Sequence, residues 1–202
     1  GLDPDKDISF LPTGFGGEVV AALKSKQVDA LGYWTGFFAG LEIQGFKFRY
    51  FYYPPIKKAP GFVLVTTEEY MKANPDVVIG IGRAKAKSLA YAFANPEATV
   101  KIYWKVFPDN KAIGVAEEDA LEADVYRLNA QLQDATVDDR PDKRWGWNDP
   151  EGWKIYHDFL LDAGTLEKAL DVERLYTNEF IDAFNDFDIN DILKLAKAGF
   201  SE

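Results

Sequence analysis

Residues 13–38 read TGFGGEVVAALKSKQVDALGYWTGFF. Two glycine turns, TGFGG and GYWTG, enclose an apolar stretch whose spacing is helical, and each turn also contains an aromatic residue. A turn needs glycine for its backbone freedom, but it does not need phenylalanine or tryptophan. The need for a turn therefore explains the glycines but does not explain the aromatic residues beside them.

Around this stretch, residues 1–66 alternate strand-like and helical runs. The helical runs are EVVAALKSK (18–26) and FFAGLEIQG (37–45). The strand-like runs are rich in β-branched and aromatic residues and are ISFL (8–11), VDALGYW (28–34), KFRYFYY (47–53) and GFVLVTT (61–67). Strands that alternate with helices indicate a parallel sheet, so this part of the chain predicts an α/β fold.

From residue 68 onward the sequence predicts helices. Thr67 is a suitable N-cap because glutamates follow it in the first turn. Two Asn-Pro pairs, at 74–75 and 95–96, are typical helix starts, and residues 148–164 form a helical pattern that Gly164 ends.

The composition excludes several classes of protein. The 202 residues carry a net charge of -10, which disfavours nucleic acids and anionic membranes as partners. There is no cysteine, so thiolate metal sites and cysteine nucleophiles are excluded. No apolar run is long enough to span a bilayer. The absence of cysteine is compatible with either the cytoplasm or the periplasm.

The sequence gives little support to enzyme chemistry. TGFGGE lacks both the GxGxxG fingerprint and the lysine of a P-loop, and taken alone it favours a tight structural turn. His157 is the one histidine, and without a specified partner it favours a core or solvated role. We therefore expect no catalytic residues, no metal and no cofactor. Two such turns at the same ends of neighbouring parallel strands, however, favour a ligand site there.

Several stretches, in this order, resemble the NMT1/THI5-like family of solute-binding proteins of ABC importers, which handle nitrate, sulfonates, taurine and thiamine-pyrimidine precursors. They are residues 1–34, PGFVLVTTEEYMKANPDVV (60–78), SLAYAFANPEATVKIYWKVFP (88–108) and the tail from WGWNDPEG onward (145–184). The resemblance covers nearly the whole chain, and its specificity lies in the order and spacing of the stretches.

The resemblance implies a periplasmic-binding-protein type 2 fold, with two α/β lobes that close on a small ligand at a hinge. By the family's layout, residues 1–53 would be the remainder of the second lobe. Residues 54–202 would be the hinge crossing and the returning part of the first lobe. The N-terminal portion of the first lobe and the start of the second would be missing, so the chain is expected to be truncated. It would be periplasmic and would deliver its ligand to a permease.

The resemblance also implies which residues face the ligand. The turns that follow second-lobe strands would present backbone N–H groups and aromatic faces to a heteroaromatic or anionic ligand, whose identity stays open. The residues expected to bind it are Gly14, Phe15, Gly16, Trp34 and Thr35, with Tyr53 and Phe62 at the hinge in second rank.

Two other readings remain. A truncated subunit that only contacts other proteins is the first alternative. A pyrimidine-precursor biosynthetic enzyme is the second, and the absence of cysteine argues against it. We also expect a homodimer, because an orphaned edge strand invites pairing.

Overall fold

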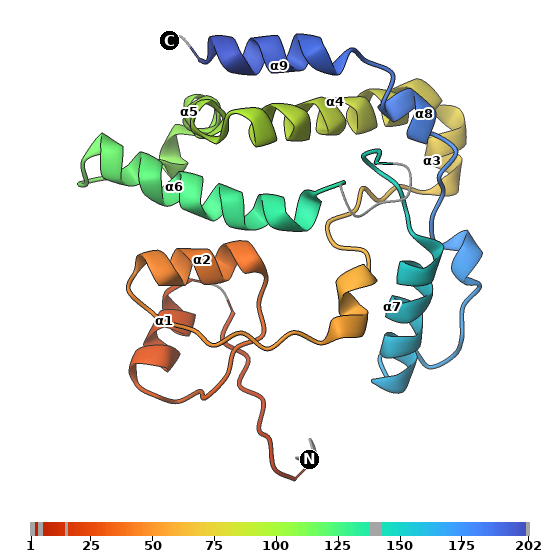
Figure 1. The fold of residues 1–202 in the computed structure, drawn as a ribbon. Coiled ribbons are helices and arrows are strands. Elements are labelled where there is room, and N and C mark those ends of the chain that lie inside the picture. The colour runs from red at the N-terminus through yellow and green to blue at the C-terminus, as the bar shows by residue number, and fades with distance from the viewer. Residues whose placement is uncertain (1–2, 4–5, 15, 138–142, 201–202) are drawn as a thin grey trace. The chain divides into compact units, whose positions relative to one another are not determined.

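The computed structural model describes residues 3, 6–14, 16–137 and 143–200. The regular elements among them are α-helices and short 3-10 helices, joined by non-helical segments (Figure 1). Their contacts divide the chain into two units, residues 1–47 and 48–202. The division by lobes at residue 53 stays a prediction.

Among its described residues, the first unit contains two helices, α1 (Gly17–Lys24) and α2 (Thr35–Ile43). Both were expected from the apolar spacing, and both bury an apolar face. Val19 and Ala22 of α1 are buried, as are Ala39 and Leu41 of α2. The two helices therefore carry the small core of this unit, and the turns that precede them lie at its surface.

The second unit contains the remaining helices. Its α-helices are α3 (Glu68–Ala73), α4 (Pro75–Ala94), α5 (Pro96–Val106), α6 (Glu117–Leu132), α7 (Pro150–Asp162), α8 (Ile181–Phe184) and α9 (Ile189–Ala198). Its 3-10 helices are η1 (Pro54–Lys58), η2 (Pro108–Asn110), η3 (Gln133–Ala135) and η4 (Val172–Arg174). The prediction that the chain is helical from residue 68 onward is thus confirmed.

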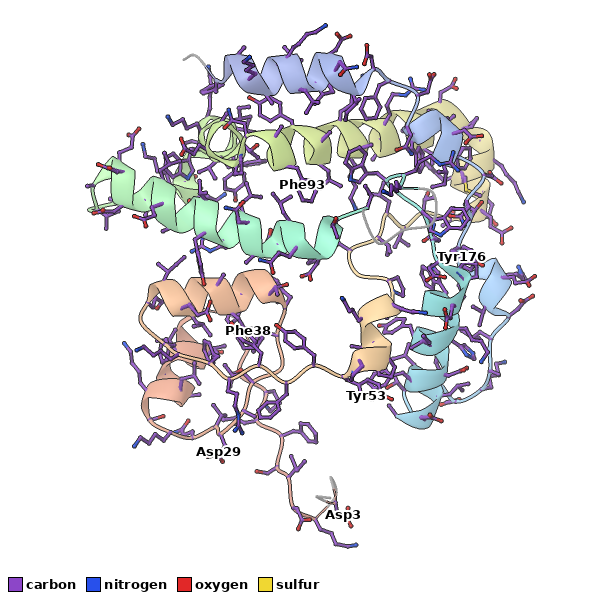
Figure 2. All side chains as sticks on the ribbon, in the orientation of Figure 1. Asp3, Asp29, Phe38, Tyr53, Phe93 and Tyr176 are labelled. Carbon is purple, nitrogen blue, oxygen red and sulfur yellow. The ribbon has the colours of Figure 1, made fainter. Side chains whose placement is uncertain are left out.

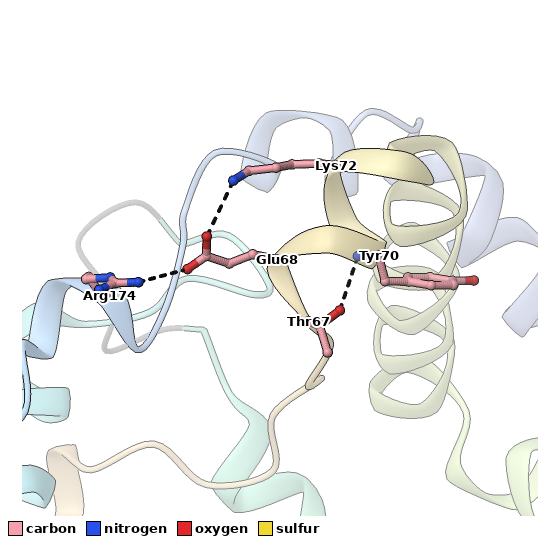
Figure 3. A network of polar contacts seen from close by, with 5 residues as sticks. All are labelled: Thr67, Glu68, Tyr70, Lys72 and Arg174. Atoms are coloured by element: carbon pink, nitrogen blue, oxygen red, sulfur yellow. Dashed lines mark hydrogen bonds and ion pairs between the residues drawn. The ribbon is translucent and has the colours of Figure 1, made fainter.

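Thr67 and Asn95, two of the predicted helix starts of this unit, are confirmed by side-chain caps. The Thr67 hydroxyl accepts a hydrogen bond from the Tyr70 amide at 3.1 Å (Figure 3). Asn95 accepts one from the Ala98 amide at 2.9 Å, and Pro96 follows it at the first helical position, where no N–H is needed.

The core of the second unit lies at two helix contacts. Between α5 and α6, Val100, Trp104 and Ala120 are buried together, and the Trp104 indole N–H donates to Asp124 at 2.8 Å. The long helix α4 packs along α8 and α9. There the contact is close because Gly82 of α4 leaves room for the ring of Phe184.

The expected α/β fold is wrong. None of the described residues forms a β-strand, so the sheet and the two α/β lobes of a periplasmic-binding-protein type 2 fold are not observed. The strand-like runs are present as non-helical segments with exposed side chains: Phe10 is 84% exposed, Phe51 79%, Phe62 80% and Val65 86%.

The physical reason is that strand propensity needs a partner. The backbone N–H and C=O groups of a strand form their hydrogen bonds with a neighbouring strand. None of the described segments forms such bonds with these strand-like runs. Helices close their hydrogen bonds locally, and they therefore form without such a partner.

Candidate functional site

The two glycine turns of residues 13–38 meet in the first unit. The Tyr33 hydroxyl donates a hydrogen bond to the backbone carbonyl of Gly14. It also lies 3.0 Å from the Thr13 hydroxyl. The turn before α1 and the turn before α2 are therefore joined through one side chain.

An aromatic cluster forms at this junction from Tyr33, Trp34 and Phe37. The rings of Tyr33 and Phe37 stack with centroids 4.2 Å apart and an interplanar angle of 17°. Trp34 is tilted by 56° against Phe37 at 5.4 Å and remains 40% exposed. One ring pair thus packs internally, while the indole of Trp34 keeps accessible surface.

The helix starts beside this cluster have no side-chain cap. Gly16 is the N-cap of α1 with φ of 86°, a conformation that favours glycine. Trp34 is the N-cap of α2, and Thr35 is the first helical residue. The Trp34 carbonyl accepts from the amides of both Phe37 and Phe38, at 3.0 and 3.2 Å.

A carboxylate sets the electrostatics of the first turn. Glu18 lies in the first turn of α1, and its Oε2 would be 2.9 Å from a Cβ added at Gly14. This negative charge occupies the position where the helix dipole would otherwise attract an anion. The junction therefore suits a neutral or cationic ligand better than a sulfonate or a phosphate.

The residues expected to bind a ligand are distributed over both units. Gly14, Gly16, Trp34 and Thr35 lie at the joined turns of the first unit. Tyr53 and Phe62 belong to the second unit and are 60% and 80% exposed; Figure 2 labels Tyr53 just before η1. Phe15 lies outside the described residues.

Sequence reasoning missed Tyr33, Thr13 and Phe37 at this site. One signal for them was available, because Tyr33 and Phe37 are four residues apart across a helix start and such side chains meet. The bond from Tyr33 to Gly14 had no local signal, since it joins positions 19 residues apart.

A second candidate is a surface hollow of about 440 Å³ in the second unit. Its lining includes Arg144, Asp182 and Asp186, and these charges already pair within the protein. Arg144 pairs with Asp182, and Arg83 reaches Asp186 at 3.6 Å. A ligand would have to displace these pairs, so the hollow is a weaker candidate than the aromatic cluster.

His157 has a structural role, as one of the two sequence readings anticipated. It is 6% exposed, and its Nε2 accepts a hydrogen bond from the Leu170 amide at 3.0 Å. Its Nδ1 lies 3.0 Å from Asp158, so the tautomer with the proton on Nδ1 satisfies both contacts. In the described part of the chain, no three or more His, Asp or Glu side chains gather as metal ligands would.

No helix among the described residues combines the length and the apolar character that a membrane crossing requires.

Comparison with known proteins gives two matches. Residues 1–99 match the family model described as NMT1/THI5 like. The riboflavin-binding protein RibY of Chloroflexus aurantiacus is 23% identical to this chain over 177 residues. Those residues are 88% of this chain and 48% of the relative, so the chain spans about half the length of the curated relative it matches. No solved structure matches. The resemblance to NMT1/THI5-like proteins is therefore confirmed over residues 1–99, just under half of the chain.

Proposed function

We propose that this chain is part of an extracytoplasmic solute-binding component of an ABC importer and binds a small planar heteroaromatic compound. The family match over residues 1–99 supports a solute-binding protein. The relative named for riboflavin supports a heteroaromatic ligand, because the flavin ring system is planar and aromatic. In this proposal the protein is periplasmic, passes its ligand to a permease and does not convert it chemically.

The observation that carries the proposal is the exposed indole of Trp34 beside the polar groups of the first turn. An aromatic face provides stacking area, while the Thr13 hydroxyl, which donates to the Tyr33 oxygen, can still accept a hydrogen bond from a ligand. The Glu18 carboxylate beside Gly14 favours a neutral or cationic compound, since it would repel an anion.

The mechanism rests on this cluster alone. Closure of two α/β lobes is not part of it, because that fold is not observed. Ligand stacked on Trp34 would order the two turns that Tyr33 joins, and recognition by the permease would follow from that ordered surface.

The test is a titration of riboflavin with the protein. Binding is measured in two ways, by the quenching of flavin fluorescence and by calorimetry. Trp34→Ala should weaken binding by about tenfold, the effect of losing an aromatic stacking contact of about 1.4 kcal/mol. Trp34→Phe should retain most of the affinity. Phe159→Ala removes an aromatic residue of similar exposure, 45%, from helix α7 and should have no effect.

Methanesulfonate, which carries a sulfonate and no cationic group, provides the comparison with an anionic ligand. It should bind more weakly than riboflavin in the unmodified chain, and Glu18→Gln should narrow that difference. Equal riboflavin affinity of Trp34→Ala and the unmodified chain, with both folded by circular dichroism, would exclude the stacking site.

A subunit that contacts other proteins is the second candidate, and the exposed apolar run of residues 62–65 favours it. Phe62 is 80% exposed and Val65 is 86% exposed. Contiguous exposed apolar residues of this kind are typical of surfaces that contact other proteins. Native mass spectrometry separates the two functions, because a retained small molecule and a retained second chain differ in mass. The homodimer expected from the sequence also remains a proposal.

A further inference from the structure

His157 of α7 is a buried titratable group that the proposed function does not use. Both nitrogens of its ring have a partner within the protein. Nε2 lies 3.0 Å from the Leu170 amide nitrogen, and Nδ1 lies 3.0 Å from a carboxylate oxygen of Asp158. A backbone amide can only donate, so Nε2 must accept and carries no proton. This arrangement fits the neutral ring, with its one proton on Nδ1.

A second proton on the ring would affect the two partners in opposite ways. On Nε2 it would face the Leu170 N–H, and two donors cannot form a hydrogen bond, so that contact would be lost. At Nδ1 the ring would keep its contact with Asp158 and gain an ion pair. Hydrogen bonds from Lys154 and then from His157 hold the pKa of the Asp158 carboxyl below its usual range, so this carboxylate stays charged in mild acid.

Asp158 is the charged group that decides whether the ring can hold a second proton. Helix α7 packs against η1 and η4. The charged residues of these two elements and of the segment between α7 and η4 are Lys57, Lys58, Glu167, Lys168, Asp171, Glu173 and Arg174. Within the described residues, none of these side chains contacts the imidazole, whereas Asp158 does. Lys58 instead pairs with Glu151, and Arg174 with Glu68.

The bond to Leu170 holds a segment that has few other backbone contacts. Just before this segment, the amides of Thr165 and Leu166 bond to the Leu160 carbonyl. In the described part of the chain, the amides of residues 167–169 form no hydrogen bond. The segment leads into η4, from which Arg174 reaches Glu68 of α3 (Figure 3). Loss of the Leu170 bond therefore frees the approach to η4.

We propose that His157 is a pH-sensitive switch, whose neutral ring holds the Leu170 amide and whose protonated ring releases it while staying on Asp158. Histidine is the side chain whose charge ordinarily changes between about pH 5 and 8, so mild acid releases the segment. The switch does not depend on the ligand proposed above, because its residues belong to the second unit and the aromatic cluster to the first.

Nuclear magnetic resonance follows both halves of the switch in one sample. The chain has a single histidine, so the ring signals need no assignment by mutation. The ring nitrogen shifts should report a proton on Nδ1 alone at pH 8 and protons on both nitrogens at pH 5. Exchange protection of the Leu170 amide, corrected for the intrinsic effect of pH, should fall about fivefold with the same midpoint, as expected for one lost hydrogen bond.

The internal control is an amide of the same turn that has no titratable partner. The Gly164 amide bonds to the Leu161 carbonyl at 2.9 Å and should keep its protection from pH 8 to pH 5. A parallel loss at Gly164 and Leu170 would mean that the end of α7 frays as a whole, which would overturn the switch.

Substitution at His157 separates titration of the ring from other effects of pH. The side-chain oxygen of His157→Gln can accept from the Leu170 amide near the position of Nε2, but it does not titrate. Leu170 should therefore stay protected down to pH 5 in this variant. The same pH dependence in His157→Gln and in the unmodified chain would overturn the proposal.

Substitution at Asp158 tests the partner of the charged ring. Asp158→Asn removes the carboxylate that stabilises the second proton and should move the release of Leu170 to lower pH. Asp162→Asn, four residues further along α7, is the matched control and should leave the release unchanged.

The unmodified chain alone can overturn the proposal, so the test does not require any variant to fold. One such result is a ring that keeps a single proton until the whole protein unfolds. The other is a Leu170 amide whose protection stays constant while the ring gains its second proton.

Discussion

The Tyr33 hydroxyl hydrogen-bonds the carbonyl of Gly14, and this contact joins the two turns that lead into α1 and α2. The Thr13 hydroxyl lies 3.0 Å from the Tyr33 hydroxyl oxygen, so the Tyr33 hydroxyl contacts two groups of the first turn. Neither turn has a side-chain cap of its own at the helix start. This one side chain therefore links the two turns of the candidate site.

Tyr33→Phe should lower the stability of the first unit while its ring still stacks on Phe37. The loss should be about 0.5–1.5 kcal/mol, the net worth of a hydrogen bond in a protein. Hydrogen exchange of the α1 amides measures this local effect. Tyr103→Phe on α5 is the control, and equal changes in α1 exchange for both variants would contradict the assignment.

Two glycines of α4 should respond to alanine in opposite directions. A Cβ at Gly82 would overlap the ring of Phe184, whereas one at Gly80 would meet nothing within 4 Å. Gly82→Ala should therefore cost about 1–3 kcal/mol through overpacking against α8. Gly80→Ala should gain up to about 1 kcal/mol, because alanine is the better helix former.

Urea unfolding of the two glycine variants measures both effects. A stabilised Gly82→Ala protein would show that α8 does not pack on α4 in solution.

The helices were predictable from the sequence because their signals are local. Thr67 and Asn95 cap the helices that begin just after them, and each bond spans three residues. The sheet was predicted wrongly because strand pairing is not local. GFVLVTT shows strand propensity, but propensity does not say which segment satisfies its backbone.

The candidate site was predictable in part for the same reason. The aromatic-glycine turns drew attention to Trp34, and Trp34 does lie at the junction of the two turns. The bond from Tyr33 to Gly14 and the carboxylate of Glu18 beside Gly14 depend on how the turns fold together. No spacing rule in the sequence specifies either contact.

Two asparagine side chains hold the loop before α7, and their removal should release it. Asn185 accepts from the Trp145 amide at 3.1 Å and donates to the Trp145 carbonyl at 3.0 Å. Asn178 makes the same pair of bonds with Asn148, at 2.8 and 2.9 Å. The side-chain amide of each asparagine thus supplies the hydrogen-bond donor and acceptor that the backbone of a neighbouring strand would otherwise provide.

Asn185→Ala should cost about 1–3 kcal/mol, because it leaves two backbone groups of a partly buried loop without partners. Tryptophan fluorescence during urea unfolding should report the change around Trp145. Asn110→Ala, at an exposed residue whose side chain forms no hydrogen bond in the described part of the chain, should be neutral. A neutral Asn185→Ala would mean that the loop does not depend on this amide.

Asp158 should make the stability of the protein depend on pH. Hydrogen bonds from Lys154 and then from His157 hold the pKa of its carboxyl below the usual range. A group whose pKa is lowered by folding stabilises the protein above its unfolded pKa, about 3.9 for aspartate, and loses this effect as pH falls through the folded value. Asp158→Asn should therefore lower the urea midpoint at pH 7, and the difference from the unmodified chain should shrink below about pH 4.

Asp162→Asn serves as the control, because Asp162 lies four residues further along α7 and makes no ion pair among the described residues. A difference between Asp158→Asn and the unmodified chain that stayed constant from neutral to acidic pH would show that the effect comes from packing and not from the charge.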